Sequence, residues 1–320
     1  MLLPLLGKRL LQAIPVIIGV SVATFALLNL LPGNPALAIL GTQATPQSLA
    51  ALNSQLGLDH PLVDRYWTWV TQALHGNLGN SLSTQQPVAH LIWQRAPVTV
   101  ELVALAFIIA LAVALPVALL SAYRPNHSFD RFTSVGSVVG LSAPAYLIAL
   151  LLSLVFAVHA RILPVVGFVS LWSDPAGNLR DLLLPAVTLS LGLFSTYVRL
   201  LRADLIDQMT ARDYIVAGRA KGLTNWQVLM RHALRNASFG LITVVGVNIG
   251  TLLGATVVVE SIFGIPGLGG QLLQAINNRD ATIVQGTVLF MAVAVVLANL
   301  LTDIVYAALD PRIRYGRNEN

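Results

Sequence analysis

The residue types that most often carry out chemistry in proteins are scattered through this sequence. Its six histidines stand singly at positions 60, 75, 90, 127, 159 and 232, whereas a metal site needs ligands paired at short spacings. The sequence has no His-Glu-x-x-His, no Gly-x-Ser-x-Gly and no Gly-x-x-x-x-Gly-Lys-Ser/Thr motif. Those motifs mark zinc proteases, serine hydrolases and phosphate-binding loops. We therefore predict that this chain has no catalytic residues, no metal ligands and no cofactor of its own.

One glycine-rich run, from Phe263 to Gly270, superficially resembles a phosphate-binding loop. It lacks both the preceding strand and the Lys-Ser/Thr pair that such a loop needs, so we interpret it as a tight re-entrant turn at the outer mouth of the protein. The absence of cysteine excludes disulfide bonds and thiolate chemistry.

The elements that position any functional residue must be membrane helices. The sequence is 56% hydrophobic and only 10% charged, against about a quarter charged in soluble domains. Its long uncharged runs are apolar on every face, which excludes the alternating pattern of a β-barrel. We predict an all-α integral membrane protein with six spans of roughly 17–25 residues each, near 10–31, 102–122, 133–157, 182–201, 237–259 and 282–306.

The basic residues indicate how these spans are oriented, because cytoplasmic loops carry an excess of Lys and Arg. With the N-terminus inside, most basic residues fall in cytoplasmic segments and only five face outward: Arg65, Arg95, Arg161, Arg180 and Arg279. Both termini then lie on the cytoplasmic side of the membrane, which we expect to be the inner membrane. The net charge of +5 therefore reflects topology in lipid and does not indicate nucleic-acid binding. A cleaved signal peptide is the weaker alternative, because the first apolar run of about 22 residues exceeds the about 7–15 residues of a signal peptide's apolar region.

This topology divides the chain into four parts. We expect a cytoplasmic N-terminus and first span at 1–31, an extracytoplasmic segment at 32–98, a core of five spans at 99–310 that includes a cytoplasmic loop at 202–236, and a cytoplasmic tail at 311–320. In the 32–98 segment, Leu62, Tyr66 and Trp69 share one helical face. We predict a small helical cap there, which serves as a lid, as a membrane-surface pad or as a ligand contact.

Polar residues within the spans are few. Glu101, Glu260 and Asp303 fall near span ends, where water and headgroups are available, so we interpret them as topological rather than proton-coupling residues. The fifth span carries glycines that let helices pack closely, Gly246, Gly250 and Gly254. Another face of that span is a candidate translocation path, Asn248, Thr251 and Ala255. An interhelical hydrogen bond explains Asn248 equally well.

The cytoplasmic loop has a helix, turn, helix pattern. Gly222 can end one helix in a left-handed conformation, and Thr224 or Asn225 can cap the next. An apolar stripe on the second helix then includes Trp226 and Met230. A short amphipathic helix of this kind either lies among lipid headgroups or inserts into a groove on a partner protein.

This loop resembles the EAA loop of bacterial ABC-importer permeases, which docks on the ATPase. Aligned on Gly222, the Glu-Ala-Ala positions fall on residues 216–218 and the His-x-Leu motif on residues 232–234. The chain departs from the consensus at Val216 and at Arg235. The resemblance implies that these residues couple the chain to an ATPase: Ala217, Gly218, Arg219, Ala220, Lys221, Gly222, Leu223, Trp226, Leu229, Met230 and His232.

Further segments are similar to the dipeptide, oligopeptide and nickel subgroup, and to the first of its two permeases. They are residues 219–223, 231–236, 31–35, 56–59, 76–81, 263–269 and 310–314. Asn34 stands where that subgroup usually has Asp.

The resemblance implies a permease that imports dipeptides or oligopeptides by alternating access. Its partners would be a second permease, two ATPase subunits that bind ATP and Mg, an extracytoplasmic substrate-binding protein and membrane lipid. Nickel or another small solute is the alternative cargo. A secondary transporter or channel would show inverted repeats with broken polar helices, and a membrane enzyme would show paired catalytic residues. We find neither pattern in the sequence.

Overall fold

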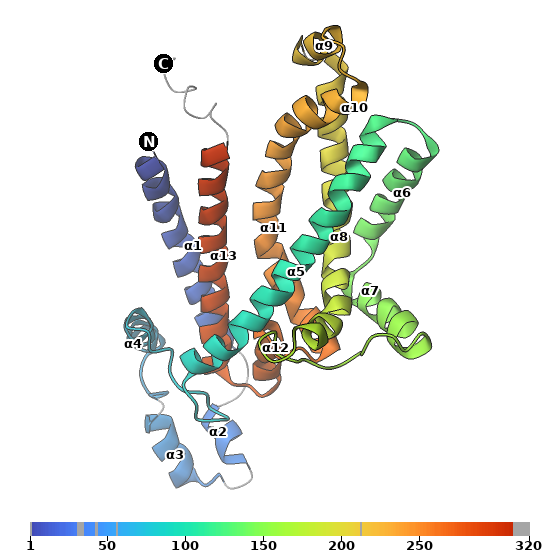
Figure 1. Ribbon diagram of the computed structural model, residues 1–320. Helices are drawn as coiled ribbons and strands as arrows, with labels where there is room; N and C mark the ends of the chain where they lie inside the picture. Colours follow the sequence, from blue (N-terminus) through green and yellow to red (C-terminus); the bar gives the residue numbers. More distant parts are fainter. Residues whose placement is uncertain (1, 31–34, 42–43, 56, 212, 310–320) are drawn as a thin grey trace. The chain divides into compact units, whose positions relative to one another are not determined.

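The computed structural model describes residues 2–309 except 31–34, 42–43, 56 and 212. Within these residues the chain is built of helices, and the single isolated β-bridge joins Asn80 and Pro87. The predicted all-α membrane fold is confirmed. The elements (Figure 1) are α1 (Leu2–Leu30), α2 (Pro35–Leu40), α3 (Pro46–Gln55), α4 (Leu62–Leu74), α5 (Val88–Tyr123), α6 (Ser128–Ser142), α7 (Ala145–Leu152), η2 (Ser153–His159), α8 (Pro175–Ala211), α9 (Asp213–Ala220), α10 (Asn225–Val228), η3 (Leu229–Ala233), α11 (Leu234–Phe263), α12 (Leu268–Asn277) and α13 (Ala281–Leu309).

Five helical segments among the described residues are long and apolar enough to cross a membrane: Arg9–Leu30, Val88–Tyr123, Pro175–Thr210, Asn225–Phe263 and Ala281–Val305. They correspond to the first, second, fourth, fifth and sixth predicted spans. The third predicted span is not one straight helix. Ser128–Ser142 and Ala145–His159 meet at an angle of 106°, so this pair is either a broken span or a re-entrant loop.

The break between α6 and α7 has a local cause. Pro144 precedes α7 with φ −62° and ψ 141°, and Ala143 is extended at φ −83° and ψ 121°. Proline crowds the residue before it and disfavours the helical conformation there. Two successive extended residues therefore end α6 and let α7 begin in a new direction.

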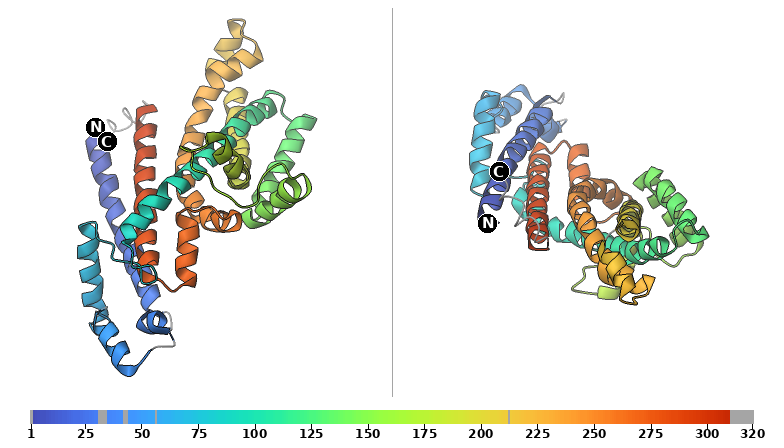
Figure 2. Two further views of the ribbon diagram at one scale, coloured as in Figure 1. Left: turned by 60° about the horizontal axis from the view of Figure 1, so that its bottom comes forward. Right: turned by 90° about the horizontal axis from the view of Figure 1, so that it is seen from above.

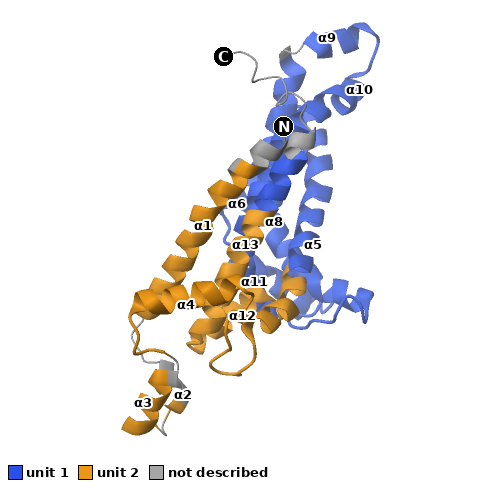
Figure 3. Ribbon diagram, turned by 90° about the vertical axis from the view of Figure 1, so that its left-hand side faces the viewer, with its two compact units in different colours: residues 1–6, 100–265, 298–320 blue, residues 7–99, 266–297 orange. Residues whose placement is uncertain are grey.

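The contacts of the chain group into two compact units, which we describe separately (Figure 3). Unit 1 comprises Met1–Leu6, Val100–Ile265 and Ala298–Asn320, and unit 2 comprises Gly7–Thr99 and Pro266–Leu297. The expected division after residue 98 lies one residue before the point where the chain passes from unit 2 to unit 1, between Thr99 and Val100 in α5. The units also divide α1 and α13, each of which the prediction kept within one part.

In unit 1, α8 is the central helix. It buries Tyr197, Leu201 and Leu205 completely, and it packs on α6, α7 and α11. Tyr197 Oη accepts a hydrogen bond of 3.3 Å from Asn248 Nδ2 of α11. Glu260, near the end of α11, is fully buried, so the water and headgroups expected at this span end do not reach its side chain.

Unit 2 has its own core, where the start of α5 meets α12 and α13. Val88, Ile92, Leu268 and Val284 are among its buried residues. The loop before α13 is fixed by Asp280, whose Oδ2 accepts hydrogen bonds from Ser81 Oγ and Ser83 Oγ, and whose Oδ1 accepts one from the Ile283 amide. On the other side of this unit, α4 lies beside α1 in both views of Figure 2.

Candidate functional site

The loop between α8 and α11 has the predicted helix, turn, helix form. Gly222 has φ +83°, a left-handed conformation that costs glycine little. Thr224, rather than Asn225, caps α10. Its Oγ1 accepts a hydrogen bond from the Gln227 amide at 3.3 Å, while Gln227 Oε1 accepts one from the Thr224 amide at 2.9 Å. This capping box fixes the direction in which α10 leaves the turn.

The short helix after the turn has one buried face and one exposed face. Val228, Leu229 and Ala233 are completely buried. On the other side, Trp226 is 39% exposed and Met230 is 40% exposed. Two apolar side chains are therefore presented outward from a well-packed base, as a surface that binds a partner requires.

The residues assigned to ATPase coupling occupy three environments. Gly218 and Leu229 are buried, and a Cβ at Gly218 would touch Val228, Leu223 and His232 at 3.5–3.7 Å. Leu223 and His232 are half-buried. The remaining assigned residues are exposed: Ala217, Arg219, Ala220, Lys221, Gly222, Trp226 and Met230. The exposed residues can contact a partner protein, whereas Gly218 and Leu229 pack inside the loop.

Sequence reasoning missed a contact that supports Trp226. The Tyr123 ring, at the end of α5, meets the Trp226 ring edge to face, with centroids 5.4 Å apart and planes at 89°. Such an aromatic pair stabilises by about 0.5–1.5 kcal/mol beyond area burial. The only signal in the sequence was an aromatic residue at the cytoplasmic end of the second predicted span.

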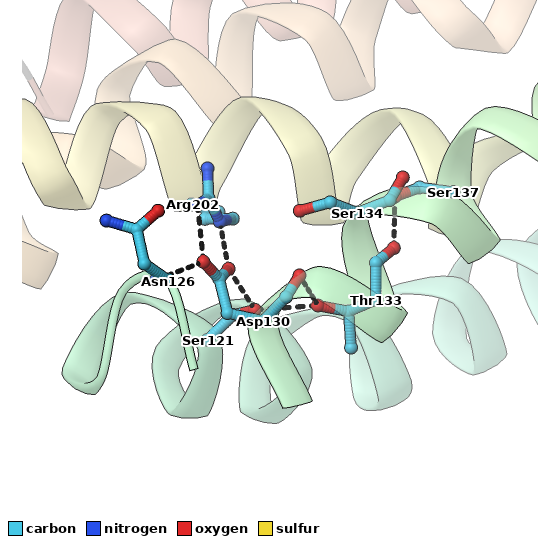
Figure 4. A network of polar contacts seen from close by, with 7 residues as sticks. All are labelled: Ser121, Asn126, Asp130, Thr133, Ser134, Ser137 and Arg202. Atoms are coloured by element: carbon cyan, nitrogen blue, oxygen red, sulfur yellow. Dashed lines mark hydrogen bonds and ion pairs between the residues drawn. The ribbon is translucent and has the colours of Figure 1, made fainter. Parts of the chain in front are cut away.

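A second missed feature is a partly buried ion pair between α6 and α8 (Figure 4). Arg202 of α8 donates through Nε and Nη2 to the two carboxylate oxygens of Asp130 in α6, with the Nη2 to Oδ2 distance 2.7 Å. Ser121 Oγ and the Asn126 amide donate to the same carboxylate at 2.8 and 2.7 Å. Asp130 is 2% exposed. The pair therefore ties the α5–α6 connection to α8.

A pocket of about 240 Å³ opens in unit 1 where α6 and α7 are broken apart. All three predicted path residues, Asn248, Thr251 and Ala255, line it, together with Thr188 and Thr196 of α8. The three threonine hydroxyls donate to backbone carbonyls of their own helices at 2.8–3.0 Å. Thr188 is 1% exposed, so the lone pairs that remain to accept hydrogen bonds from a ligand are those of Thr196 and Thr251.

Asn248 also donates to Tyr197, so the interhelical bond and the pocket position occur together. The three glycines of α11 differ in surroundings. A Cβ on Gly246 would overlap the Thr302 side chain of α13, whereas a Cβ on Gly254 would have no atom within 4 Å. Gly250 is half-buried.

The other motifs of the sequence are placed as follows. Gly264, with φ +64°, ends α11 and leads through a short turn to α12. Residues 31–34, 56 and 310–314 lie outside the described residues. Within the described ranges, no three His, Cys, Asp or Glu side chains are grouped as metal ligands.

The matches to known proteins cover nearly the whole length of the chain. Residues 114–315 match a family described as binding-protein-dependent transport system inner membrane component, and residues 1–103 match its N-terminal region. A putative peptide transport system permease protein of Brucella melitensis is 40% identical, over 98% of this chain and 100% of the relative. The dipeptide transport system permease protein DppB of Escherichia coli is 35% identical, over 97% of this chain and 98% of the relative.

A solved structure gives the same architecture. The inward-facing MetNI methionine ABC transporter contains a chain that matches with a TM-score of 0.57, covering 69% of this chain and 96% of that chain. At 19% identity this likeness shows the fold alone.

Proposed function

Because the chain belongs to the family of binding-protein-dependent transport system inner membrane components, we propose that it is the permease subunit of an ATP-driven importer of dipeptides or oligopeptides. The main observation behind this proposal is the loop after α8. Gly222 turns the chain there in a left-handed conformation, and the short helix that follows has one buried face and exposes Trp226 and Met230 on the other. The names of the full-length relatives from Brucella and Escherichia coli support the choice of peptides as cargo.

The partners follow from this role. Separate ATPase subunits bind ATP and Mg, and the loop residues Trp226 and Met230 enter a groove on one of them. A second permease completes the membrane part, and an extracytoplasmic binding protein delivers the substrate. The loop faces the cytoplasm together with both termini, an orientation supported by the concentration of basic residues in residues 199–235.

The loop and the pocket are joined by two helices. α8 leads into the loop and α11 leads out of it, and both helices line the pocket through Thr188, Thr196, Asn248 and Thr251. A displacement of the loop by the ATPase therefore moves the walls of the pocket as rigid bodies, which is the geometry that alternating access requires. The pocket's hydroxyl and amide groups suit the backbone of a peptide, which needs hydrogen-bond partners rather than charges.

Substitution in the pocket tests this role. Asn248→Leu and Thr251→Leu place bulk in the pocket and remove its polar groups, so we expect ATP-dependent uptake of a labelled dipeptide by proteoliposomes to fall at least several-fold. Val247→Leu is the matched control, because Val247 is 64% exposed on the same helix and does not line the pocket. Uptake at the wild-type rate in both pocket variants, at equal abundance, would assign these residues to helix packing instead.

A further inference from the structure

Helix α4 of unit 2 presents three different faces along its length. One face packs on α1, where Tyr66 Oη and Ser21 Oγ share a hydrogen bond of 2.7 Å. The Tyr66 ring also meets the Phe25 ring edge to face, with centroids 5.4 Å apart. Figure 3 shows α4 running across α1 rather than along it. These contacts fix the level of α4 relative to a membrane-spanning helix.

A second face of α4 is apolar, and none of the residues that the structure describes covers it. Val63, Trp67 and Leu74 recur at i, i+4 and i+11 and are 65%, 60% and 82% exposed. The third face carries Thr68 and Thr71, whose hydroxyls donate to backbone carbonyls of α4 at 2.8 and 2.9 Å. This separation of an apolar stripe from a polar one is typical of helices that lie in the plane of a membrane.

The contacts with α1 show how deep α4 lies. The apolar segment of α1 runs from Arg9 to Leu30. Ser21 is nine positions before Leu30, about 14 Å along the helix at 1.5 Å per residue, and one leaflet of a hydrocarbon core of about 30 Å is about 15 Å thick. Phe25 lies about 8 Å from Leu30 along the axis of α1, at the same rise per residue. A helix whose tyrosine reaches both residues is at the level of the acyl chains.

The surface of α1 at this level is apolar as well. Val22, Leu27 and Leu30 are 45%, 65% and 77% exposed, as expected of side chains that contact lipid. Arg65 Cζ stands 6.0 Å from the centre of the Phe25 ring. A long arginine side chain buries its stem in an apolar layer while its charge reaches toward the headgroups. Arg65 lies beside Phe25, nearer the Leu30 end of α1 than the contact of Tyr66 with Ser21, so α4 lies between the headgroups and the bilayer centre.

We infer that α4 is an in-plane helix embedded in the leaflet around the Leu30 end of α1, where Val63, Trp67 and Leu74 contact acyl chains. The occupant of the stripe is lipid because the stripe continues the lipid-facing surface of α1 at the same depth. The predicted outer cap is therefore part of the membrane domain along α4.

The absence of cysteine makes a direct test available. Val63→Cys and Leu74→Cys place a nitroxide label on the stripe, and Thr68→Cys and Thr71→Cys place it on the polar face of the same helix. All four positions are exposed, so no core contact is lost. The assembled transporter is reconstituted in phosphatidylcholine and phosphatidylglycerol vesicles, and collision rates with oxygen, which partitions into lipid, and with a water-soluble nickel chelate are measured.

We expect the ratio of oxygen to nickel collisions to be at least several-fold higher at positions 63 and 74 than at 68 and 71. Equal ratios at all four positions would overturn the inference, because α4 would then lie in water. Low collision rates with both reagents at 63 and 74 would also overturn it, because a protein partner would then cover the stripe. Substrate-stimulated ATP hydrolysis by each labelled complex verifies that it is folded.

Discussion

At the scale of single residues, Gly222 is the position whose backbone conformation sets the turn of the loop. Its φ of +83° is left-handed, which costs an ordinary residue about 1–2 kcal/mol and a β-branched one more. A side chain there would meet no neighbouring atom within 4 Å, so the effect of Gly222→Val isolates the backbone. We expect this variant to lose substrate-stimulated ATP hydrolysis, measured in the reconstituted complex, whereas Gly222→Asn retains most of it because asparagine tolerates this conformation.

Asp280 gives a prediction that depends on pH. Burial opposes ionisation of this carboxyl, but hydrogen bonds from Ser81 and from the Ser83 and Ile283 amides outweigh it, so its pKa lies below the ordinary value. A carboxyl whose pKa is lower in the folded state stabilises the protein above its unfolded pKa, near 4, and loses that contribution as the pH falls.

We therefore expect Asp280→Asn to lower the free energy of unfolding at pH 7 by about 1.5–3 kcal/mol, the usual contribution of hydrogen bonds to a charged group. The difference in Tm between wild type and variant should shrink below about pH 4. Thermal unfolding in detergent at a series of pH values measures both quantities. A difference that stays constant down to pH 3 would mean that the charge of Asp280 contributes nothing.

At the scale of elements, the ion pair between Asp130 and Arg202 holds α6 against α8. Arg202→Leu leaves a carboxylate that is 3% exposed without a counter-charge, whereas Asp130→Asn leaves an arginine that is 25% exposed and can reach water. We expect Arg202→Leu to destabilise by about 3–5 kcal/mol and Asp130→Asn by less. Thermal unfolding of the two variants and of the double variant Asp130→Leu, Arg202→Leu measures this. A double variant less stable than Arg202→Leu would contradict this account.

The sequence predicted the helices better than it predicted their contacts. Apolar runs located the spans, and a glycine followed by Thr224 located the turn of the loop, because these signals are local. The sequence analysis did not predict the 106° break at Pro144. Another proline, Pro185, lies inside α8 without ending it, so the presence of a proline does not by itself determine a break. The pairs Asp130–Arg202 and Tyr123–Trp226 join residues far apart in the chain, and no periodicity reveals such pairing.

At the scale of the whole molecule, we propose that this chain is the membrane subunit of a transporter whose ATP hydrolysis takes place in other subunits. Its permease family is established by matches across nearly all of the sequence. Its structure adds a loop with an exposed apolar surface, and two helices that run from that loop to a pocket lined by both polar and apolar side chains. Under the function that we propose, transport depends on contact of another subunit with Trp226 and Met230.

The most direct test is substrate-stimulated ATP hydrolysis by the reconstituted transporter carrying Trp226→Ala. Docking of this side chain contributes at most about 1.5–3 kcal/mol, so the account predicts weaker co-purification of the ATPase and a clear loss of stimulated hydrolysis. Trp172→Ala is the matched control, because Trp172 is 93% exposed and lies outside the loop, and it should behave as wild type. Full ATPase binding and wild-type stimulation in the Trp226→Ala complex would contradict the assignment of this loop as the coupling element.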